Sequence, residues 1–494
     1  MPIVTNNGQP FFYTKGKIMN VVFLVLGIFL LFGCVPKDML AKNEGERPIL
    51  CKEFKATEAD GLSDTYVANR SFWRTFNAHY SRNDSGSNSN GPRKLLVFMD
   101  GTGNDKSSST NVRKLYRLAV QHACSGKRII PYYDKGVGAK LINRVTGGIG
   151  GRGTSLNIRQ AYRFLIETYL PGDEIYIIGF SRGAFTARSL NGLIEFAGLV
   201  DRRSIPPKWY DTFEWIGATN LHFSIGALYD VYHQDFDGTA EFEERIRGEL
   251  KTLMDSRGMT AYKDKDKVKV TAIGVFDTVP ALGLIRDDEP DDHRLELYAD
   301  NGFHALALDE QRDDFRLLRF DPLRAVQGSR LEEVWFAGVH SDVGGSYSLE
   351  YNCTSKDNFN GLATTPLNWM LNKFSKFDIF PPTDELIKLA DQEKNGFLQC
   401  GCAHEANPFI ECNCGLLHDE FFDGGFGFFQ NMGTFPRRPH PGDNIHRSVL
   451  QRIRSAKIFK PHTRREAGGR YLFLGRTISG NSDEFFAKNF KVVE

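Results

Sequence analysis

Residues 179–183, Gly-Phe-Ser-Arg-Gly, constrain this chain more than any other stretch because two segments of different periodicity meet there. The apolar run at 175–178 is typical of a buried strand, and residues 184–190 have helical character. A serine between two glycines at a strand-to-helix turn is held in a strained conformation that lifts its hydroxyl clear of the sheet. The positive end of the following helix points at the same place. We therefore interpret Ser181 as a nucleophile.

Three more apolar runs end in a polar residue, as the run before Ser181 does. They are residues 94–99 before Asp100, residues 268–276 before Asp277, and residues 331–339, apolar from 334 on, before His340. Helical patterns alternate with these runs, near 112–122, 155–169 and 240–254, and another apolar run lies near 129–133. The alternation predicts an α/β protein with a mostly parallel sheet. Since the carboxyl ends of parallel strands meet at one edge, we expect these four polar residues to gather there.

A serine nucleophile needs an imidazole to take its proton and a carboxylate to hold that imidazole in the right tautomer. On an α/β-hydrolase sheet the chain order is serine, acid, histidine, and Ser181, Asp277 and His340 satisfy it. Asp342 as the acid and His446 as the base keep the same order. We favour the first set because Asp277 and His340 both end apolar strands, whereas His446 begins a helical pattern.

Stabilising the negative charge that develops during acyl transfer requires two hydrogen-bond donors. The turn places the Arg182 amide for this role, and the amide of Gly101 or Thr102 is the candidate for the second donor. Asp100 would repel an oxyanion if its carboxylate faced the site. We therefore expect that carboxylate to be tied into its own turn by nearby amides.

A glycine-rich segment at 147–153 precedes the helix predicted at 155–169. Such a segment can cradle phosphate, but this one lacks the lysine of a P-loop and does not fit the dinucleotide fingerprint. We predict an active-site loop.

Beyond residue 347 the strand signals thin out, and helices are predicted at 361–374, 384–391 and 446–453. Four cysteines lie in a long loop between them, Cys400, Cys402, Cys412 and Cys414. Paired C-x-C groups bind zinc in some proteins, but the spacing is tighter than a usual zinc knuckle, so disulfide bonding is slightly favoured and no metal is assigned.

The N-terminal region has the pattern of an export signal. Residues 21–33 carry no charge, follow two lysines, and are too few to cross a membrane, which takes about 20. Cys34 directly after them matches a lipoprotein processing site, where the cysteine is lipidated; the alternative is an uncleaved signal anchor. We predict a signal peptide at 1–33, a tether at 34–92, a catalytic core at 93–350, and a helical and loop-rich extension at 351–494 that completes or caps the core.

The charge balance excludes one broad class of partner. With 62 basic and 61 acidic residues, the net charge of +1 provides no field that would attract a polyanion, so we expect no nucleic acid partner.

Four spaced motifs together resemble the catalytic domain of type VI secretion phospholipase effectors of the first lipase class. They are residues 100–104, 179–185, 275–279 and 339–345, and the segment 446–449 resembles a further part of the family. The resemblance covers roughly residues 94–347. It implies an α/β-hydrolase fold with a nucleophile elbow, activity on phospholipid acyl esters, and a triad of Ser181, Asp277 and His340. The expected acyl-enzyme mechanism requires no metal, and we expect no cofactor.

The motifs and the N-terminal region together predict a membrane-attached serine esterase, most concretely a phospholipase of the bacterial cell envelope. The membrane surface is then its partner, and the resemblance leaves room for an inhibitory or secretion partner of unknown identity. Three alternatives stay open: a catalytically silent envelope lipoprotein that serves as an interaction module, an esterase for soluble substrates, and a secreted or delivered effector.

Overall fold

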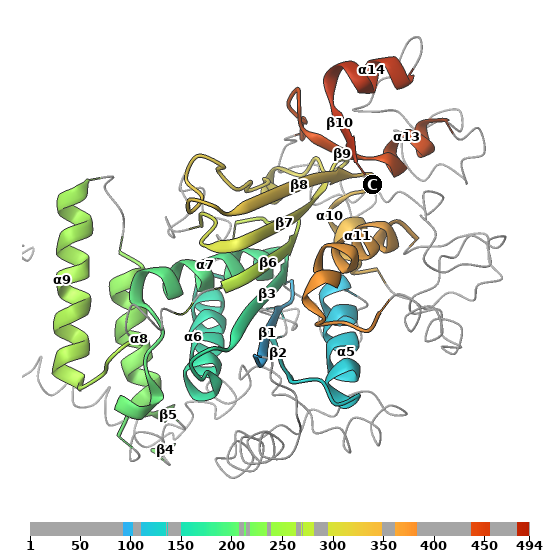
Figure 1. Cartoon of the computed structure of the whole chain (residues 1–494). Helices are drawn as coiled ribbons and strands as arrows, with labels where there is room; N and C mark the ends of the chain where they lie inside the picture. Colours follow the sequence, from blue (N-terminus) through green and yellow to red (C-terminus); the bar gives the residue numbers. More distant parts are fainter. Residues whose placement is uncertain are drawn as a thin grey trace, which may run out of the picture.

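One eight-stranded sheet organises the computed structural model. The structure describes residues 92–101, 110–134, 136, 150–206, 212–213, 218–234, 239–262, 268, 270–280, 295–347, 361–382, 436–454 and 482–493. The strand order is β10-β9-β8-β7-β6-β3-β1-β2, and every neighbouring pair is parallel (Figure 1). The strands are β1 (Lys94–Met99), β2 (Ile129–Asp134), β3 (Glu174–Phe180), β6 (Val270–Phe276), β7 (Ala299–Ala307), β8 (Arg330–Phe336), β9 (Asn444–His446) and β10 (Lys491–Val493).

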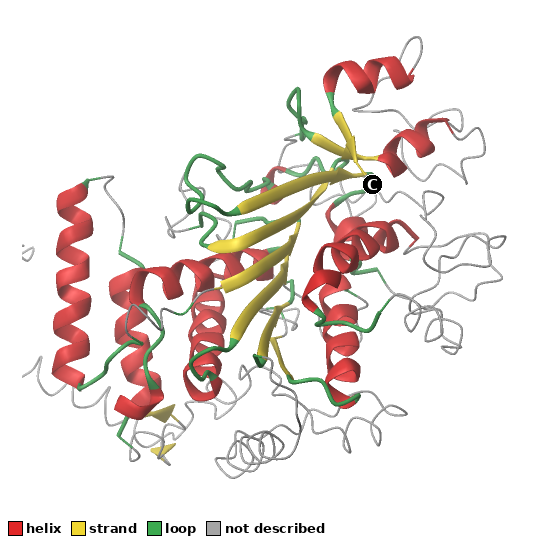
Figure 2. Ribbon diagram, viewed as in Figure 1, coloured by secondary structure: helices red, strands yellow, loops and turns green. Residues whose placement is uncertain are grey.

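Helices cover both faces of this sheet (Figure 2). On one face lie α6 (Gly150–Thr168), α7 (Arg182–Ala197) and α8 (Asn220–Tyr232), with α9 (Ala240–Arg257) packed outside α8. On the other lie α5 (Asn111–Cys124) and α11 (Thr364–Phe374). Other elements are the short helix α10 (His340–Gly344), the antiparallel pair β4 (Thr212–Phe213) and β5 (Ala218–Thr219), and α13 (Arg447–Arg454) and α14 (Ser482–Asn489) beside the last strands.

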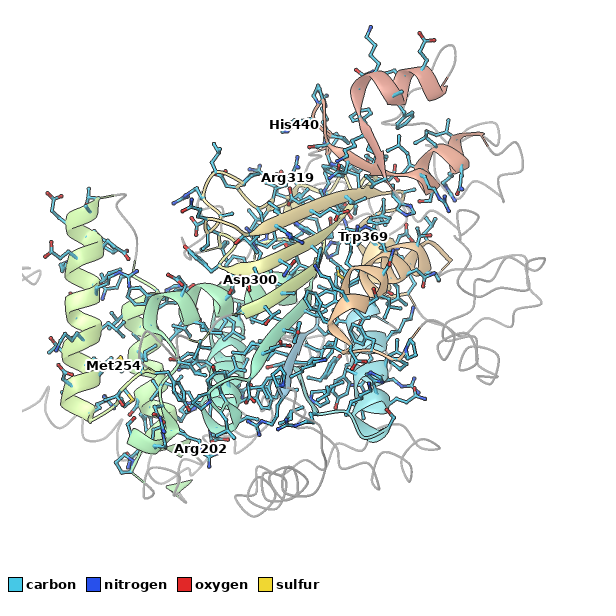
Figure 3. The ribbon with its side chains drawn as sticks, viewed as in Figure 1. Arg202, Met254, Asp300, Arg319, Trp369 and His440 are labelled. Atoms are coloured by element: carbon cyan, nitrogen blue, oxygen red, sulfur yellow. The ribbon has the colours of Figure 1, made fainter. Side chains whose placement is uncertain are left out.

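The central strands are apolar on both faces because each face meets a helical layer. In β1, Leu95 and Val97 belong to the core shared with α6 and α7, while Leu96 and Phe98 belong to the core shared with α5 and α11. Trp369 of α11 closes the second core, with its ring centroid 5.6 Å from that of Phe336 in β8 (Figure 3). Two buried layers therefore hold the strand ends in fixed positions.

The strand order reverses between β1 and β3. From β1 the chain moves outward to β2, then returns to the opposite side of β1 at β3 and continues through β6, β7 and β8. In open parallel sheets, ligands bind outside the carboxyl ends of the strands at such a reversal. Ser181 follows β3 and Asp100 follows β1, so both lie at this point. The prediction of an α/β-hydrolase fold with a mostly parallel sheet is confirmed.

Several elements differ from the sequence prediction. The strands predicted at 94–99, 129–133, 175–178, 268–276 and 331–339 correspond to β1, β2, β3, β6 and β8, whereas β7, β9 and β10 were not predicted. Helix α6 begins at Gly150, so residues 150–153 of the glycine-rich segment are helical and not part of a loop. The C-terminal region contributes strands as well as the predicted helices, because β9 pairs with β8 and β10 with β9.

Some predictions lie outside the described residues. These are the signal and tether at 1–91 with Cys34, the helix at 384–391, and the four cysteines at 400–414. Within the described residues, no helix is both long enough and apolar enough to span a membrane.

Candidate active site

Close backbone packing explains both glycines around Ser181. A Cβ atom on Gly183 would lie 2.3 Å from the Met99 carbonyl oxygen, and one on Gly179 would lie 2.6 Å from the Gly183 carbonyl oxygen. Any side chain at either position would push α7 away from the carboxyl ends of β1 and β3. Ser181 itself has φ 60° and ψ −129°, a conformation that residues with a Cβ rarely adopt.

The Ser181 hydroxyl contacts the imidazole of His340. Ser181 Oγ lies 2.7 Å from His340 Nε2, and the two residues are 7% and 3% exposed. His340 is the first residue of α10, just beyond β8. Its ring packs between Phe180 and Phe315, at centroid distances of 4.7 Å and 4.9 Å. Two aromatic walls thus fix the plane of the imidazole.

Asp277 lies on the other side of the same imidazole. Its Oδ2 atom is 2.5 Å from His340 Nδ1, and its Oδ1 atom accepts a hydrogen bond of 2.8 Å from the Ala307 amide. Oδ1 also accepts from Arg437 Nη1. Burial raises the pKa of Asp277, but Arg437 and His340 outweigh it and hold that pKa well below its usual range. The carboxylate therefore stays ionised.

Burial has the opposite consequence for His340. It lowers the pKa of the imidazole, and the neighbouring carboxylates of Asp277 and Glu310 offset that effect only in part. A neutral imidazole that donates from Nδ1 to Asp277 leaves Nε2 as an acceptor facing Ser181. This is the state that a general base requires.

The Asp100 carboxylate is bonded by one amide of its own turn, as expected, and by two hydroxyl groups from elsewhere in the fold. Its Oδ1 accepts 2.7 Å from the Gly101 amide, and its Oδ2 accepts 2.6 Å from both Thr110 Oγ1 and Tyr133 OH. Burial raises the pKa of this carboxyl. The Gly101 amide therefore already donates within the turn. Of the other oxyanion candidates, Arg182 is the first residue of α7, and Thr102 lies outside the described residues.

The alternative acid and base have other partners. His446 Nδ1 is 2.8 Å from Ser448 Oγ, and its ring stacks on Phe336 at 4.8 Å. The Asp342 carboxylate accepts 3.0 Å from the Val339 amide at the start of α10. The imidazole that contacts Ser181 in the described part of the chain is that of His340.

Two charged residues near the site were missed by sequence analysis. Glu310 accepts from the backbone amide of His340 at 3.2 Å and pairs with Arg312 at 2.8 Å. Arg437 reaches Asp277 from a segment 160 residues further along the chain. No local sequence pattern marks either residue. Glu310 follows a strand that was not predicted, and Arg437 lies in a loop between two prolines. No group of three or more His, Cys, Asp or Glu side chains among the described residues could hold a metal ion.

A family comparison matches most of the sheet. The model of the family described as "T6SS, Phospholipase effector Tle1-like, catalytic domain" matches residues 93–373. A curated relative, "Uncharacterized protein YEL023C" of Saccharomyces cerevisiae, is 28% identical over 263 residues, which is 49% of this chain and 35% of that protein.

Solved structures give weaker likenesses. An uncharacterized protein from Pseudomonas aeruginosa is 18% identical with a TM-score of 0.36, covering 64% of this chain and 50% of that one. The Tle1 effector bound to the VgrG spike is 17% identical with a TM-score of 0.25, covering 54% and 52%. Carboxylesterase Cest-2923 from Lactobacillus plantarum is 12% identical with a TM-score of 0.29, covering 60% and 91%. This chain thus spans a third to a half of the first relatives that it matches.

Proposed function

Because the chain belongs to the family of Tle1-like phospholipase effector catalytic domains, we propose that it is a serine hydrolase that cleaves acyl esters of lipids, most concretely phospholipids. The observation that carries the proposal is the continuous chain of contacts from Ser181 Oγ through the His340 ring to Asp277. A hydroxyl, an imidazole and an ionised carboxylate in this order are the components that acyl transfer needs. They stand at the carboxyl ends of β3, β8 and β6.

In the proposed reaction Ser181 Oγ attacks the acyl carbonyl carbon while His340 Nε2 takes the hydroxyl proton. Asp277 stabilises the imidazolium that forms and keeps its ring in place. The imidazolium then gives its proton to the departing alcohol oxygen, which leaves an acyl ester on Ser181. A water molecule, deprotonated by His340, then attacks this ester; its bond to Ser181 Oγ breaks, the imidazolium returns the proton to Oγ, and the fatty acid is released.

The oxyanion requires donors near Ser181. We assign one to the Arg182 amide, which the elbow and the N-terminus of α7 place beside the nucleophile. For the second, the Thr102 amide is favoured over that of Gly101, because the Gly101 amide already donates to Asp100.

The test compares phospholipid vesicles with a water-soluble acyl ester as substrates of the whole chain. We expect fatty acid release from vesicles, covalent labelling by a fluorophosphonate probe, and loss of both in Ser181→Ala, with a fall in rate of up to about 10⁶-fold. Cleavage of the soluble ester alone would support the serine hydrolase mechanism and contradict the assignment of lipids as substrates. An unlabelled parent would instead support the silent interaction module.

We also propose that the enzyme is attached to a membrane through a lipidated Cys34. An exported precursor cleaved before this residue would place the catalytic domain at the surface that contains its substrate. Metabolic fatty acid labelling of the parent, lost in Cys34→Ser, is the expected result. Equal labelling of both chains, or a parent that keeps its first residues, would favour a delivered effector.

A further inference from the structure

A buried cation lies against the outer oxygen of Asp277. The Arg437 side chain is 3% exposed, and its Nη1 pairs with Asp277 Oδ1. The same nitrogen donates 3.0 Å to the Ala307 carbonyl oxygen, and Nη2 donates 2.7 Å to the Phe315 carbonyl oxygen. A guanidinium this deeply buried requires a countercharge and hydrogen-bond acceptors. Asp277 supplies the countercharge, and the ends of β6 and β7 with the segment that carries Phe315 supply acceptors for Nη1 and Nη2, while the buried Nε has no hydrogen-bond partner among the described residues.

Arg437 comes from outside the region that the family match covers. That match ends at residue 373, and residues 383–435 separate Arg437 from the preceding described segment. The neighbouring Arg438 is exposed, so the burial is specific to one of two adjacent arginines. Seven residues after Arg437 the chain enters β9 at the side of β8. The C-terminal segment thus brings a charge to the centre of the site.

We propose that Arg437 is a positioning residue that fixes the carboxylate of Asp277 for its contact with His340. The inference rests on the proposed function, in which Asp277 orients the imidazole. With Oδ1 held by Arg437 and by the Ala307 amide, the free direction of the carboxylate is that of Oδ2, which faces His340 Nδ1. Arg437 acts through Asp277 and has no contact with His340 or Ser181 among its hydrogen bonds.

The positive charge also balances the negative charge that Asp277 directs at the imidazole. The other charged groups that face His340 are Glu310, which accepts from its amide, and Arg312, whose guanidinium pairs with Glu310 and lies over Phe315. These two charges compensate each other. Removal of the Arg437 charge therefore leaves Asp277 uncompensated and favours the imidazolium, which raises the pKa of His340.

The main test is Arg437→Gln, assayed with phospholipid vesicles across pH. We expect kcat to fall by about 10²-fold, the scale of a misplaced catalytic group, while KM stays unchanged because Arg437 does not touch substrate. Activity is lost as pH falls through the pKa of His340, so this acidic limb should move to higher pH. Arg437→Lys should return the limb to the parent position with partial recovery of kcat. Arg438→Gln is the matched control and should match the parent.

A double variant separates a positioning role from a purely structural one. If Arg437 acts through Asp277, then Arg437→Gln combined with Asp277→Asn should be no slower than Asp277→Asn alone. The double variant also removes the buried unpaired carboxylate, so it stays informative if Arg437→Gln alone fails to fold, as does Arg437→Lys. Fully additive losses, or an Arg437→Gln enzyme with the kcat and pH profile of the parent, would overturn the inference. A parent chain that is inactive and is not labelled by the fluorophosphonate would instead contradict the proposed function.

Discussion

Ser181 carries a backbone conformation that most residues with a side chain avoid. Its φ of 60° and ψ of −129° follow from the tight packing of α7 against the end of β1, and such strain costs about 1–3 kcal/mol. Asp277 also has a positive φ, 46°. Ser181 and Asp277 contact the His340 imidazole from opposite sides, and both have a positive φ. Backbone strain is thus found at two of the three groups of the candidate triad.

Replacing the serine should separate strain from chemistry. Ser181→Gly should raise the free energy of unfolding by about 1 kcal/mol over Ser181→Ala, because glycine adopts this conformation without a Cβ clash while alanine keeps the strain. Both variants should lose ester hydrolysis. Denaturant unfolding measures the difference. An alanine variant as stable as the glycine variant would show that the elbow is not strained.

The two candidate sets of acid and base give different expectations for activity. His340→Ala should slow ester hydrolysis nearly as much as Ser181→Ala does, and Asp277→Asn by about 10⁴-fold, since tautomer control is only part of the rate. Asp342→Asn should retain more activity than Asp277→Asn. Steady-state rates on a soluble ester decide this, and a silent His340→Ala would transfer the base to another residue.

His446 should contribute to acid sensitivity rather than to catalysis. Burial, with Arg447 and Lys373 nearby, lowers its pKa from 6.5 to about 3. Below pH 6.5 His446 therefore becomes protonated in the unfolded chain but stays neutral in the folded chain. The free energy of unfolding consequently falls as pH drops towards 3. His446→Asn can still accept from the Ser448 amide, as His446 does at 3.2 Å, but does not titrate.

The measurement is the unfolding midpoint of parent and His446→Asn between pH 7.5 and pH 4. Equal midpoints at pH 7.5 and a smaller loss on acidification in the variant are expected. Identical slopes would mean that His446 titrates normally in the folded chain. Loss of ester hydrolysis in this variant at pH 7.5 would revive the alternative assignment of His446 as the base.

At the scale of elements, the strands that could be predicted from the sequence are those that contain an apolar run. β1, β2, β3 and β6 are mostly apolar runs, and β8 is apolar in its second half, whereas β7 contains Asn301 and His304, whose polarity hides a buried strand. The structure satisfies them individually: Asn301 Nδ2 donates 2.9 Å to the Thr271 carbonyl oxygen, and His304 Nδ1 is 2.9 Å from Glu333. Such partners belong to other strands and cannot be seen locally. β9 has only three residues, too few for any period.

The same reasoning explains the outcome at the candidate site. Ser181, Asp277 and His340 follow apolar strands, and this pattern made them candidates in the sequence. Arg437 lies in no helix or strand, and its place in the candidate site depends on a contact with Asp277, 160 residues earlier in the chain. Long-range ion pairs carry no sequence period, so this part of the site required the structure.

A charged network joins β8 to the segment before β9. Arg319 donates to both oxygens of Asp443 at 2.9 Å and 3.0 Å, and Asp443 also accepts 2.9 Å from Trp335 Nε1 and 2.9 Å from the His440 amide. Figure 3 labels Arg319 and His440 at this end of the sheet. The Asp443 side chain is 12% exposed, so these bonds are partly shielded from water.

Asp443→Ala should therefore lower the free energy of unfolding by about 2 kcal/mol, because it leaves several donors without their charged acceptor. Glu249→Ala on α9 is the control, since that carboxylate pairs with Arg245 where both side chains are more than 40% exposed. Its effect should stay below about 0.5 kcal/mol. Chemical denaturation of both variants tests the contrast, and equal effects would show that the network adds no stability.

At the scale of the whole molecule, the sheet extends past the family match. β9 and β10 lie at one edge and follow residue 440, and without them β8 would present an unpaired edge that invites aggregation. The predicted extension at 351–494 therefore contributes strands to the same sheet as the predicted core.

A chain of residues 93–382 should accordingly aggregate and lack ester hydrolysis, while a chain of residues 93–494 should hydrolyse esters at the parent rate. Size-exclusion chromatography and fluorophosphonate labelling of both chains give the comparison. A monomeric, labelled 93–382 chain would show that β9, β10 and Arg437 are dispensable. An inactive 93–494 chain would assign a role to residues 1–92.

The position of Arg437 along the chain sets an order of events during translation. Ser181, Asp277 and His340 leave the ribosome first, and the cation that neutralises the buried Asp277 follows 97 residues after His340. Domains fold as their residues emerge, so we expect an incomplete chain to hold all three groups without the balanced charge that orients them. A nascent chain stalled before residue 437 should then be inert towards a fluorophosphonate, and the proposed esterase activity would appear only after Arg437 has emerged.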